Sequence, residues 1–429
     1  MSQRTQGKNH TQEETFLQEL ARHVRESRKI ASLQGMEALE KASIKEIVDG
    51  LVEYAYKSTA SDIHIDPIEG GTIIRYRIDG ILHDVLLLSS EVHFKVVTRI
   101  KVLSELRTDE HYAPQDGRFR MILNTIPVDM RVSISPTFFG ENTVIRLLVG
   151  QTSSLALEEL GFSQKDLKRI QDSIQKSYGM VIATGPTGSG KTTTLYAIVD
   201  ILNSRERSII TIEDPIEYTV PGVTQIQINP RTDLTFAKGL RTIVRQDPNI
   251  IMVGEIRDEE TARISINAAM TGHLLLTTLH TSSAAVTLPR LFDMGIEPFL
   301  IASTINVAIG QRLVRRLCKE CVQKKPLSDI ERESLAGFIS SKELEKITHS
   351  FLPQGCSVCS QTGYIGRLGI YEVLEMSEAV KRLIMKRENA AEIQKVALEE
   401  GMTTMISDGI SKAAAGLTSL AEVVRVIQE

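Results

Sequence analysis

The chain contains two stretches with different patterns of hydrophobic and polar residues. From Ser43, apolar residues recur at helical spacing, and Ser43 with Glu46 forms the capping box that begins a helix. From Ser61, apolar residues alternate with polar ones, and Asp79-Gly80 supplies the preferred pair for a two-residue hairpin turn. With a further helix at about 91–106 and more alternating strands to Ile134, residues 43–149 predict a small α+β domain.

Two features of this domain bear on function. The segment Gln115-Asp116-Gly117-Arg118 is typical of a turn. Arg118 and Arg131 stand among the strand arginines, most of which are ordinarily solvated, yet a planar guanidinium also suits the γ-phosphate of a nucleotide. The strand pattern alone leaves both roles open.

Beyond a small, polar linker at 150–156, short apolar strands alternate with helices. The pattern predicts helices at 163–177 and 192–205, and strands at 180–184, 208–212, 250–253 and 274–278. Such alternation indicates a largely parallel sheet covered by helices, with a ligand at the carboxyl ends of the strands. Residues 157–429 therefore predict an α/β domain.

The strand at 180–184 runs into a glycine-rich turn that fits the phosphate-loop pattern G-x-x-x-x-G-K-[ST]. Glycines let backbone N–H groups turn toward a phosphate, and the positive end of the following helix faces the same anion. Lys191 is expected to reach the β- and γ-phosphates, and Thr192 to bind Mg²⁺. A chance match is disfavoured because the flanking strand and helix fit as well. The residues expected around ATP are Gly185, Pro186, Thr187, Gly188, Ser189, Gly190, Lys191, Thr192 and Thr193.

Polar side chains follow the neighbouring strands. They are Glu213, Asp214 and Glu217 after the strand at 208–212, Glu255 after the strand at 250–253, and His280 after the strand at 274–278. Because the carboxyl ends of parallel strands meet at one edge of a sheet, we expect these side chains at one crevice. There, glutamates can orient the attacking water and a histidine can sense the γ-phosphate. Taken singly, each acid is more often a helix cap or a solvated loop residue.

The strand at 250–253 ends in Gly254-Glu255, so the aspartate that usually follows a Walker B strand as a direct Mg²⁺ ligand is absent. Metal binding is then expected to depend on Thr192, the phosphates and water, with Glu213 or Glu255 acting indirectly.

Composition narrows the classes of function. The chain has 429 residues, 42% of them hydrophobic, and a formal net charge of −4, which gives no global reason to expect nucleic-acid binding. Residues 1–42 are polar and predict a loosely attached helix and tail, with disorder as the alternative. Neither a secretion signal nor a membrane span is expected, because no apolar run approaches about 18 residues.

Four cysteines form two CxxC pairs, Cys318/Cys321 and Cys356/Cys359. In a chain without an export signal, this spacing indicates one tetrahedral, structural Zn²⁺ rather than disulfides, with metal-free thiols as the alternative. The metal would clip a subdomain at about 316–366, including a helical excursion at about 328–349, to the main body. Residues 312–317, just before the first pair, are expected to end a helix.

Several ordered motifs resemble the secretion ATPases of type II secretion and type IV pilus assembly. They are GPTGSGKTTT at 185–194, ITIEDPIEY at 210–218, RQDP…VGEIRD within 245–258, TGH…TLHT within 271–281, and, upstream, SDIHIDP, RYRIDG and PQDGR. The Gly254-Glu255 ending is that family's own variant of Walker B. The similarity covers about residues 43–429.

The resemblance implies a RecA-like phosphate-loop ATPase domain, preceded by a small α+β, PAS-like domain and carrying a zinc-clipped C-terminal insertion. It implies a cytoplasmic homo-hexameric ring, peripheral on the inner membrane, with ATP held between the small domain of one subunit and the ATPase domain. The implied partners are an inner-membrane platform protein and a membrane-associated adaptor. The residue roles it implies are Glu213 polarising water, Glu255 as the Walker B acid, His273 and His280 in the histidine box, and Arg118 and Arg131 near the γ-phosphate.

Within the family, the tetracysteine pattern resembles the secretion and pilus-extension branch. Type II secretion, pilus extension and a DNA-uptake pseudopilus remain alternatives, because these residues look alike in all three. A nucleic-acid translocase is disfavoured, since the sequence lacks a strongly basic stripe or an aromatic platform for single strands, and we expect no direct nucleic-acid contact. The intact Lys191, Thr192, Glu213 and Glu255 disfavour a nucleotide-binding scaffold without turnover.

Overall fold

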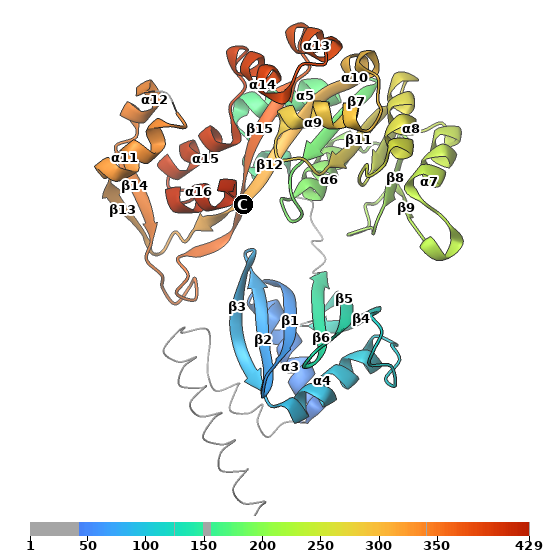
Figure 1. The fold of residues 1–429 in the computed structure, drawn as a ribbon, viewed down its shortest axis with the longest axis vertical. Helices are drawn as coiled ribbons and strands as arrows, with labels where there is room; N and C mark the ends of the chain where they lie inside the picture. Colours follow the sequence, from blue (N-terminus) through green and yellow to red (C-terminus); the bar gives the residue numbers. More distant parts are fainter. Residues whose placement is uncertain (1–42, 124, 149–155, 340, 429) are drawn as a thin grey trace, which may run out of the picture. The chain divides into compact units, whose positions relative to one another are not determined.

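The structure of the protein is a computed structural model that describes residues 43–123, 125–148, 156–339 and 341–428 (Figure 1). The expected tail at 1–42 and nearly all of the expected linker at 150–156 lie outside the described residues. The chain divides into two compact units. One contains the N-terminal domain together with the short loops Cys318–Cys321 and Gln354–Ile365, and the other contains Thr152–Leu317, Val322–Pro353 and Gly366–Glu429.

The N-terminal domain is a six-stranded antiparallel sheet in the order β3-β2-β1-β6-β5-β4, packed against two helices. Its elements are α3 (Ile44–Lys57), β1 (Ala60–Ile68), β2 (Gly71–Ile78), β3 (Ile81–Leu88), α4 (Ser90–Leu103), β4 (Gln115–Leu123), β5 (Ile126–Thr137) and β6 (Gly140–Leu148). The predicted capping box of Ser43 and Glu46 is present, and Asp79 and Gly80 form the two-residue turn between β2 and β3. The predicted α+β domain is confirmed.

The prediction of a turn at Gln115–Arg118 is wrong. These residues begin β4 and pair with β5, where Gly117 lies opposite Val132. A Cβ at Gly117 would lie 2.9 Å from the backbone oxygen of Ser104. Gly117 therefore allows a close approach between two backbones inside a strand. In the sequence, such a glycine looks the same as a glycine in a turn.

The second unit is built on a seven-stranded sheet in the order β15-β12-β7-β11-β10-β8-β9. The strands are β7 (Gly179–Thr184), β8 (Ile209–Glu213), β9 (Thr224–Gln227), β10 (Ile250–Val253), β11 (Leu274–Leu279), β12 (Ile305–Leu317) and β15 (Tyr364–Glu375). From β12 to β9, each strand pairs in parallel with its neighbour. Alternate residues of β7 enter separate cores, Met180 and Ile182 in one and Val181 and Ala183 in the other. Both faces of this sheet are therefore buried.

Helices cover the two faces of this sheet (Figure 1). One core includes α5 (Gln164–Ile174) and α6 (Lys191–Leu202), and the other includes α7 (Phe236–Ile243), α8 (Glu259–Met270), α9 (Ala284–Asp293), α10 (Pro298–Thr304), α13 (Glu378–Met385) and α14 (Ala390–Glu399). The remaining strands are β13 (Val322–Pro326) and β14 (His349–Pro353), an antiparallel pair separated in sequence by α11 (Asp329–Ala336) and α12 (Ser341–Lys346). The remaining helices are α15 (Met405–Ala414), α16 (Leu420–Gln428) and the short 3-10 helices η1 (Leu157–Leu160), η2 (Pro230–Thr232) and η3 (Val244–Gln246). The predicted parallel α/β architecture is confirmed.

The prediction that residues 312–317 end a helix is wrong, because they belong to the long strand β12. After Gln311, the buried residues of this strand are Val314 and Leu317, at every third position. That spacing is close to the period of a helix, although these residues form a strand.

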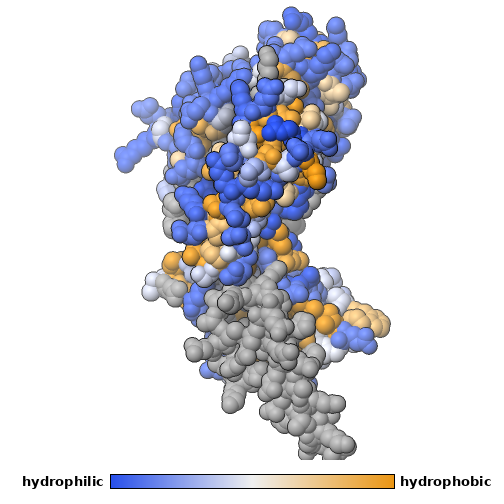
Figure 2. Space-filling model, turned by 90° about the vertical axis from the view of Figure 1, so that its left-hand side faces the viewer, coloured by the Kyte–Doolittle hydropathy of each residue, from blue (hydrophilic) through white to orange (hydrophobic). Residues whose placement is uncertain are grey.

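On the face drawn in Figure 2, hydrophilic side chains predominate and hydrophobic side chains gather in patches between them. No helix in the part of the chain that the structure describes combines the length and the apolar character that a membrane span requires.

Candidate functional site

The phosphate loop lies at the carboxyl end of β7 and leads directly into α6. Gly190 caps the helix in the left-handed region at φ 87°, and Gly185 and Gly188 also have positive φ values of 150° and 79°. Residues other than glycine rarely adopt a backbone conformation with positive φ. The sequence therefore folds here into a turn that presents the positive end of α6 at the edge of the sheet.

Lys191, the first residue of α6, is only 8% exposed. Its Nζ donates hydrogen bonds to the backbone oxygens of Gly185 at 2.8 Å and Pro186 at 2.9 Å. Burial lowers the pKa of Lys191 to about 8, and the negative charge of Glu255 opposes this shift. The side chain is thus held inside the loop, within electrostatic reach of the carboxylate that follows β10.

Glu255 is held by a guanidinium and an imidazole. Its Oε1 accepts a hydrogen bond from Nη2 of Arg257 at 2.6 Å, and its Oε2 lies 3.3 Å from Nε2 of His280. Burial alone would raise the pKa of Glu255, but Arg257 and His280 outweigh burial and hold it below its usual value. The carboxyl ends of β7, β10 and β11 therefore lie close together, as expected, and bring with them Lys191, Glu255 and His280.

Glu213 is the last residue of β8 and is 2% exposed. Its carboxylate accepts hydrogen bonds from the hydroxyl of Tyr196 on α6, from Oγ1 of Thr211 at 2.5 Å and from Nε2 of Gln225 at 3.1 Å. A carboxylate engaged by three donors is fixed in place. This geometry favours a role for Glu213 in joining α6 to β8 over the expected role in polarising water. The exposed Glu217 lies in the same acidic segment.

The two histidines expected in the site lie at opposite ends of β11. His280 follows the strand, whereas His273 precedes it. The backbone oxygen of His273 accepts a hydrogen bond at 3.2 Å from the N–H of Gly179, at the start of β7. The ring nitrogen Nδ1 of His273 lies 2.9 Å from the backbone oxygen of Ala268. His273 therefore does not belong to the cluster around Lys191, because a parallel strand carries its first and last residues to opposite edges of the sheet.

Threonine hydroxyls connect the start of the phosphate loop to the histidine segment. Thr184, the last residue of β7, hydrogen-bonds through its hydroxyl to that of Thr281 and donates to the backbone oxygen of Leu279 at 3.1 Å. The hydroxyl of Thr278 donates to the backbone oxygen of Gly254 at 2.7 Å, which ties β11 to the segment that carries Glu255. These contacts fix the relative positions of the three strand ends.

Arg118 and Arg131 lie in the N-terminal domain, where they are direct cross-strand partners in β4 and β5. Arg131 also lies opposite Arg146 in β6. In this row, Nε of Arg146 donates to Oδ1 of Asp62 at 2.9 Å. The expected contact of Arg118 and Arg131 with a γ-phosphate remains a prediction.

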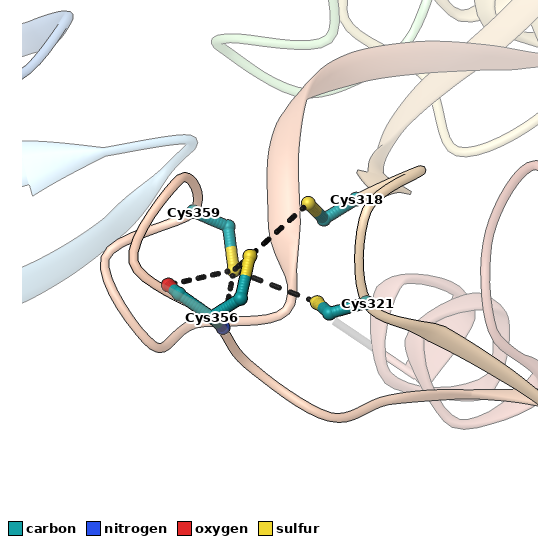
Figure 3. A group of neighbouring side chains, drawn as sticks. All are labelled: Cys318, Cys321, Cys356 and Cys359. Carbon is teal, nitrogen blue, oxygen red and sulfur yellow. Dashed lines mark hydrogen bonds between the residues drawn. The ribbon is translucent and has the colours of Figure 1, made fainter.

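The four cysteines bring their sulfur atoms together (Figure 3). The Sγ atoms of Cys318 and Cys356 are 3.8 Å apart, those of Cys321 and Cys359 3.7 Å, and those of Cys356 and Cys359 3.6 Å. Four sulfurs bound tetrahedrally at about 2.3 Å from Zn²⁺ lie about 3.8 Å from one another. The donor set therefore fits one closed Zn²⁺ site, as the spacing of the pairs indicates.

Backbone donors support this arrangement of thiols. The N–H groups of Cys356 and Gly363 each donate to Sγ of Cys359 at 3.1 Å. Burial alone would raise the pKa of Cys359, but these donors outweigh burial and lower it to about 7. Burial raises the pKa of Cys318 and raises that of Cys321 to about 12, so a metal would have to displace protons from these two thiols.

Sequence reasoning missed three residues that shape the site: Tyr196, Gln225 and Gln311. Tyr196 lies in α6, Gln225 in β9 and Gln311 in β12. No local motif marks such a residue, because its partners lie elsewhere in the chain.

The comparisons with known proteins agree with this geometry. Residues 37–425 match the family described as type II/IV secretion system protein. The type II secretion system protein E of Aeromonas hydrophila and the type II secretion system ATPase E of Vibrio cholerae are each 43% identical over 394 residues, which cover 92% of this chain and 77% of each relative. The resemblance carried by the motifs is confirmed.

Solved structures share the fold. The Legionella pneumophila ATPase DotB aligns with a TM-score of 0.64 at 23% identity, covering 89% of this chain and 95% of DotB. The pilus retraction motor PilT, solved with bound ADP, aligns with a TM-score of 0.59 at 25% identity, covering 87% of this chain and 95% of PilT. With the phosphate loop and its acidic partner in place, the chain belongs to the type II/IV secretion system protein family, as one of its ATPases.

Proposed function

We propose that the chain hydrolyses ATP at the cluster of Lys191, Glu255 and His280 and uses the energy to drive type II protein secretion. The observation that carries the proposal is the placement of Lys191 within electrostatic reach of Glu255, at the end of β7 where the phosphate loop meets α6. A phosphate bound there would replace the loop carbonyls as the partner of Lys191 and favour its charged form.

In this proposal, the chain's own residues position the nucleotide and the water. The backbone of the phosphate loop and the Lys191 ammonium hold the β- and γ-phosphates. Glu255, whose pKa is held low by Arg257 and His280, would act as the base beside the γ-phosphate. The exposed Glu217, in the same acidic segment as Glu213, would be a second carboxylate that orients the water.

Two metals complete the proposal. Mg²⁺ would be held by the exposed hydroxyl of Thr192 together with the phosphates, and would neutralise charge that develops on the γ-phosphate. Zn²⁺ would be held by Cys318, Cys321, Cys356 and Cys359, a closed set with no position for substrate, so its role is to stabilise the fold.

Partners and assembly follow from membership of the family. We propose a homo-hexameric ring in the cytoplasm, held at the inner membrane by a platform protein and an adaptor. In that ring, Arg118 and Arg131, cross-strand neighbours in β4 and β5, would approach the γ-phosphate. Pilus or pseudopilus assembly is the second candidate, because PilT, a pilus motor, shares the fold over most of this chain.

The test is a comparison of ATP binding and ATP turnover by the assembled protein and by its Glu255→Gln variant. The amide has the same shape as the carboxylate but cannot act as a base. The proposal expects the variant to bind ATP with wild-type affinity and to lose turnover by at least about a hundredfold. A wild-type protein that binds ATP without turnover would make it a scaffold, and turnover stimulated only by DNA would make it a nucleic-acid motor.

A further inference from the structure

A buried amide outside the phosphate-loop motif contacts the loop from the neighbouring strand. Gln311 lies in β12, which pairs in parallel with β7 so that Gly310 is opposite Thr184. The next residues in the two strands are Gln311 and Gly185, where the loop begins. The Gln311 side chain is fully enclosed, with 1% of the residue exposed.

The amide of Gln311 joins the loop to the helix that follows it. Its Nε2 donates to the backbone oxygen of Ser189 at 2.9 Å, and its Oε1 accepts from Oγ1 of Thr194 at 2.9 Å. Ser189 lies in the loop, and Thr194 lies in the first turn of α6. The side-chain amide donates through its nitrogen and accepts through its oxygen, whereas a carboxylate in its place could only accept.

The loop is also shaped around Gln311. A Cβ at Gly185 would lie 2.3 Å from the backbone oxygen of Gln311, and a Cβ at Gly190 would lie 3.4 Å from its Nε2. Gly185 therefore admits the backbone of Gln311, whereas the distance at Gly190 is an ordinary van der Waals contact. The hydrogen bond to Ser189 joins the loop to a residue more than a hundred positions away in the sequence.

We propose that Gln311 is a positioning residue for the nucleotide phosphates, acting through Ser189 and Thr194. The amide holds the loop in the curve in which its N–H groups converge, so that binding need not first order the loop. This inference rests on the proposed function of the loop as the ATP site. It predicts that Gln311 changes nucleotide affinity and the KM for ATP more than it changes kcat.

The test uses two substitutions that remove one hydrogen bond each. Gln311→Glu puts a carboxylate oxygen against the backbone oxygen of Ser189 but still accepts from Thr194, and Thr194→Val removes the other bond at nearly constant volume. Equilibrium binding of ADP is measured for each purified protein, together with KM and kcat for ATP. We expect Kd and KM to rise at least about fivefold in Gln311→Glu, and by less in Thr194→Val, while kcat changes by less than about twofold.

Two controls distinguish positioning from general damage. Asn306 is a buried amide of the same strand that donates to the backbone oxygen of Tyr178 at 3.0 Å, next to the opposite end of β7. Asn306→Asp should lower the melting temperature and leave Kd for ADP unchanged. In Gln311→Glu, protonation of the new carboxyl group at lower pH restores a donor toward Ser189, so the affinity relative to wild type should recover as the pH falls.

The outcomes separate the inference from the function on which it rests. A wild-type protein that binds no ADP would contradict the proposed function. A wild-type protein that binds ADP, with unchanged Kd in both Gln311→Glu and Thr194→Val, would overturn the inference alone. If Gln311→Glu does not fold, the Kd of Thr194→Val decides the question.

Discussion

The hydroxyl of Tyr196 on α6 donates a hydrogen bond to the carboxylate of Glu213 at the end of β8. The pair joins the helix that follows the phosphate loop to the strand that precedes the acidic segment. Burial, and then the hydrogen bond to Glu213, raise the pKa of Tyr196 far above its usual value, so the phenol remains a donor. Glu213 thus has a structural partner that it would have to leave in order to polarise water.

This pairing predicts different effects for two acids of the same segment. Glu213→Gln should lower the melting temperature, because an amide in place of the buried carboxylate disturbs three hydrogen bonds, at a cost of about 1–3 kcal/mol. Glu217→Gln is the matched control for loss of charge, and it should lower the melting temperature by less, because Glu217 is exposed whereas Glu213 is buried.

The rate of ATP turnover per folded molecule then shows which of the two acids orients the attacking water. We expect it to fall by more than about tenfold in Glu217→Gln and by less than about threefold in Glu213→Gln. A loss confined to Glu213→Gln would restore the role that the sequence suggested for the buried carboxylate.

The pKa of Lys191 predicts how nucleotide affinity depends on pH. In the nucleotide-free protein this pKa is about 8, and a bound phosphate raises it, so binding takes up a proton above that pH. Affinity is therefore fully present below about pH 8 and should fall about tenfold by about pH 9. Titration of ADP binding by calorimetry in buffers of different ionisation enthalpy measures both the affinity and the proton uptake.

Lys191→Arg is the control for this effect, because a guanidinium stays charged throughout that range. Its affinity should be lower than that of wild type but independent of pH. The same fall in affinity above pH 8 in Lys191→Arg would trace the effect to another group.

Arg257 sets the acid limit of turnover in this account. Its hydrogen bond and charge are the largest influences that lower the pKa of Glu255 against the effect of burial. In Arg257→Ala that pKa should rise, and because the ionised carboxylate is the active form, turnover should be lost at a higher pH on the acid side. The pH–rate profile measures the shift. Arg263→Ala, which breaks surface ion pairs with Glu259 and Glu297, should leave the profile in place.

The cysteine cluster predicts one Zn²⁺ per chain. Elemental analysis of the purified protein should find it, and Cys321→Ser should lose it. A strong chelator should lower the melting temperature of the wild type, because a structural metal contributes to folding. The melting temperature of Cys321→Ser should not change on chelation. Wild-type protein with four reduced thiols, no metal and an unchanged melting temperature would show that the cluster is stable without an ion.

The parts of the fold that follow from local pattern were predicted well from the sequence. The Ser43 cap, the Asp79-Gly80 turn and the strands at the centre of the second unit are set by residues close together in the chain. Gly117 and residues 312–317 were misread because their conformation depends on backbones and cores contributed from elsewhere.

The same distinction applies to the candidate site. Lys191, Glu255 and His280 follow strands, so the rule for parallel sheets brings them together. His273 precedes its strand, and that rule carries it to the opposite edge. The hydrogen bonds of Glu213 and the contact of Gln311 with the phosphate loop join segments that are distant in sequence, and no spacing within the chain reveals them.

The most direct test of the central claim is the rate of phosphate release from ATP by the assembled protein and by its Lys191→Ala variant. Both proteins are first shown to be folded by their melting temperatures, and the assay contains Mg²⁺. The account predicts release by the wild type and a rate at background for Lys191→Ala, because the γ-phosphate then lacks its cation. A Lys191→Ala protein that releases phosphate at the wild-type rate would contradict it.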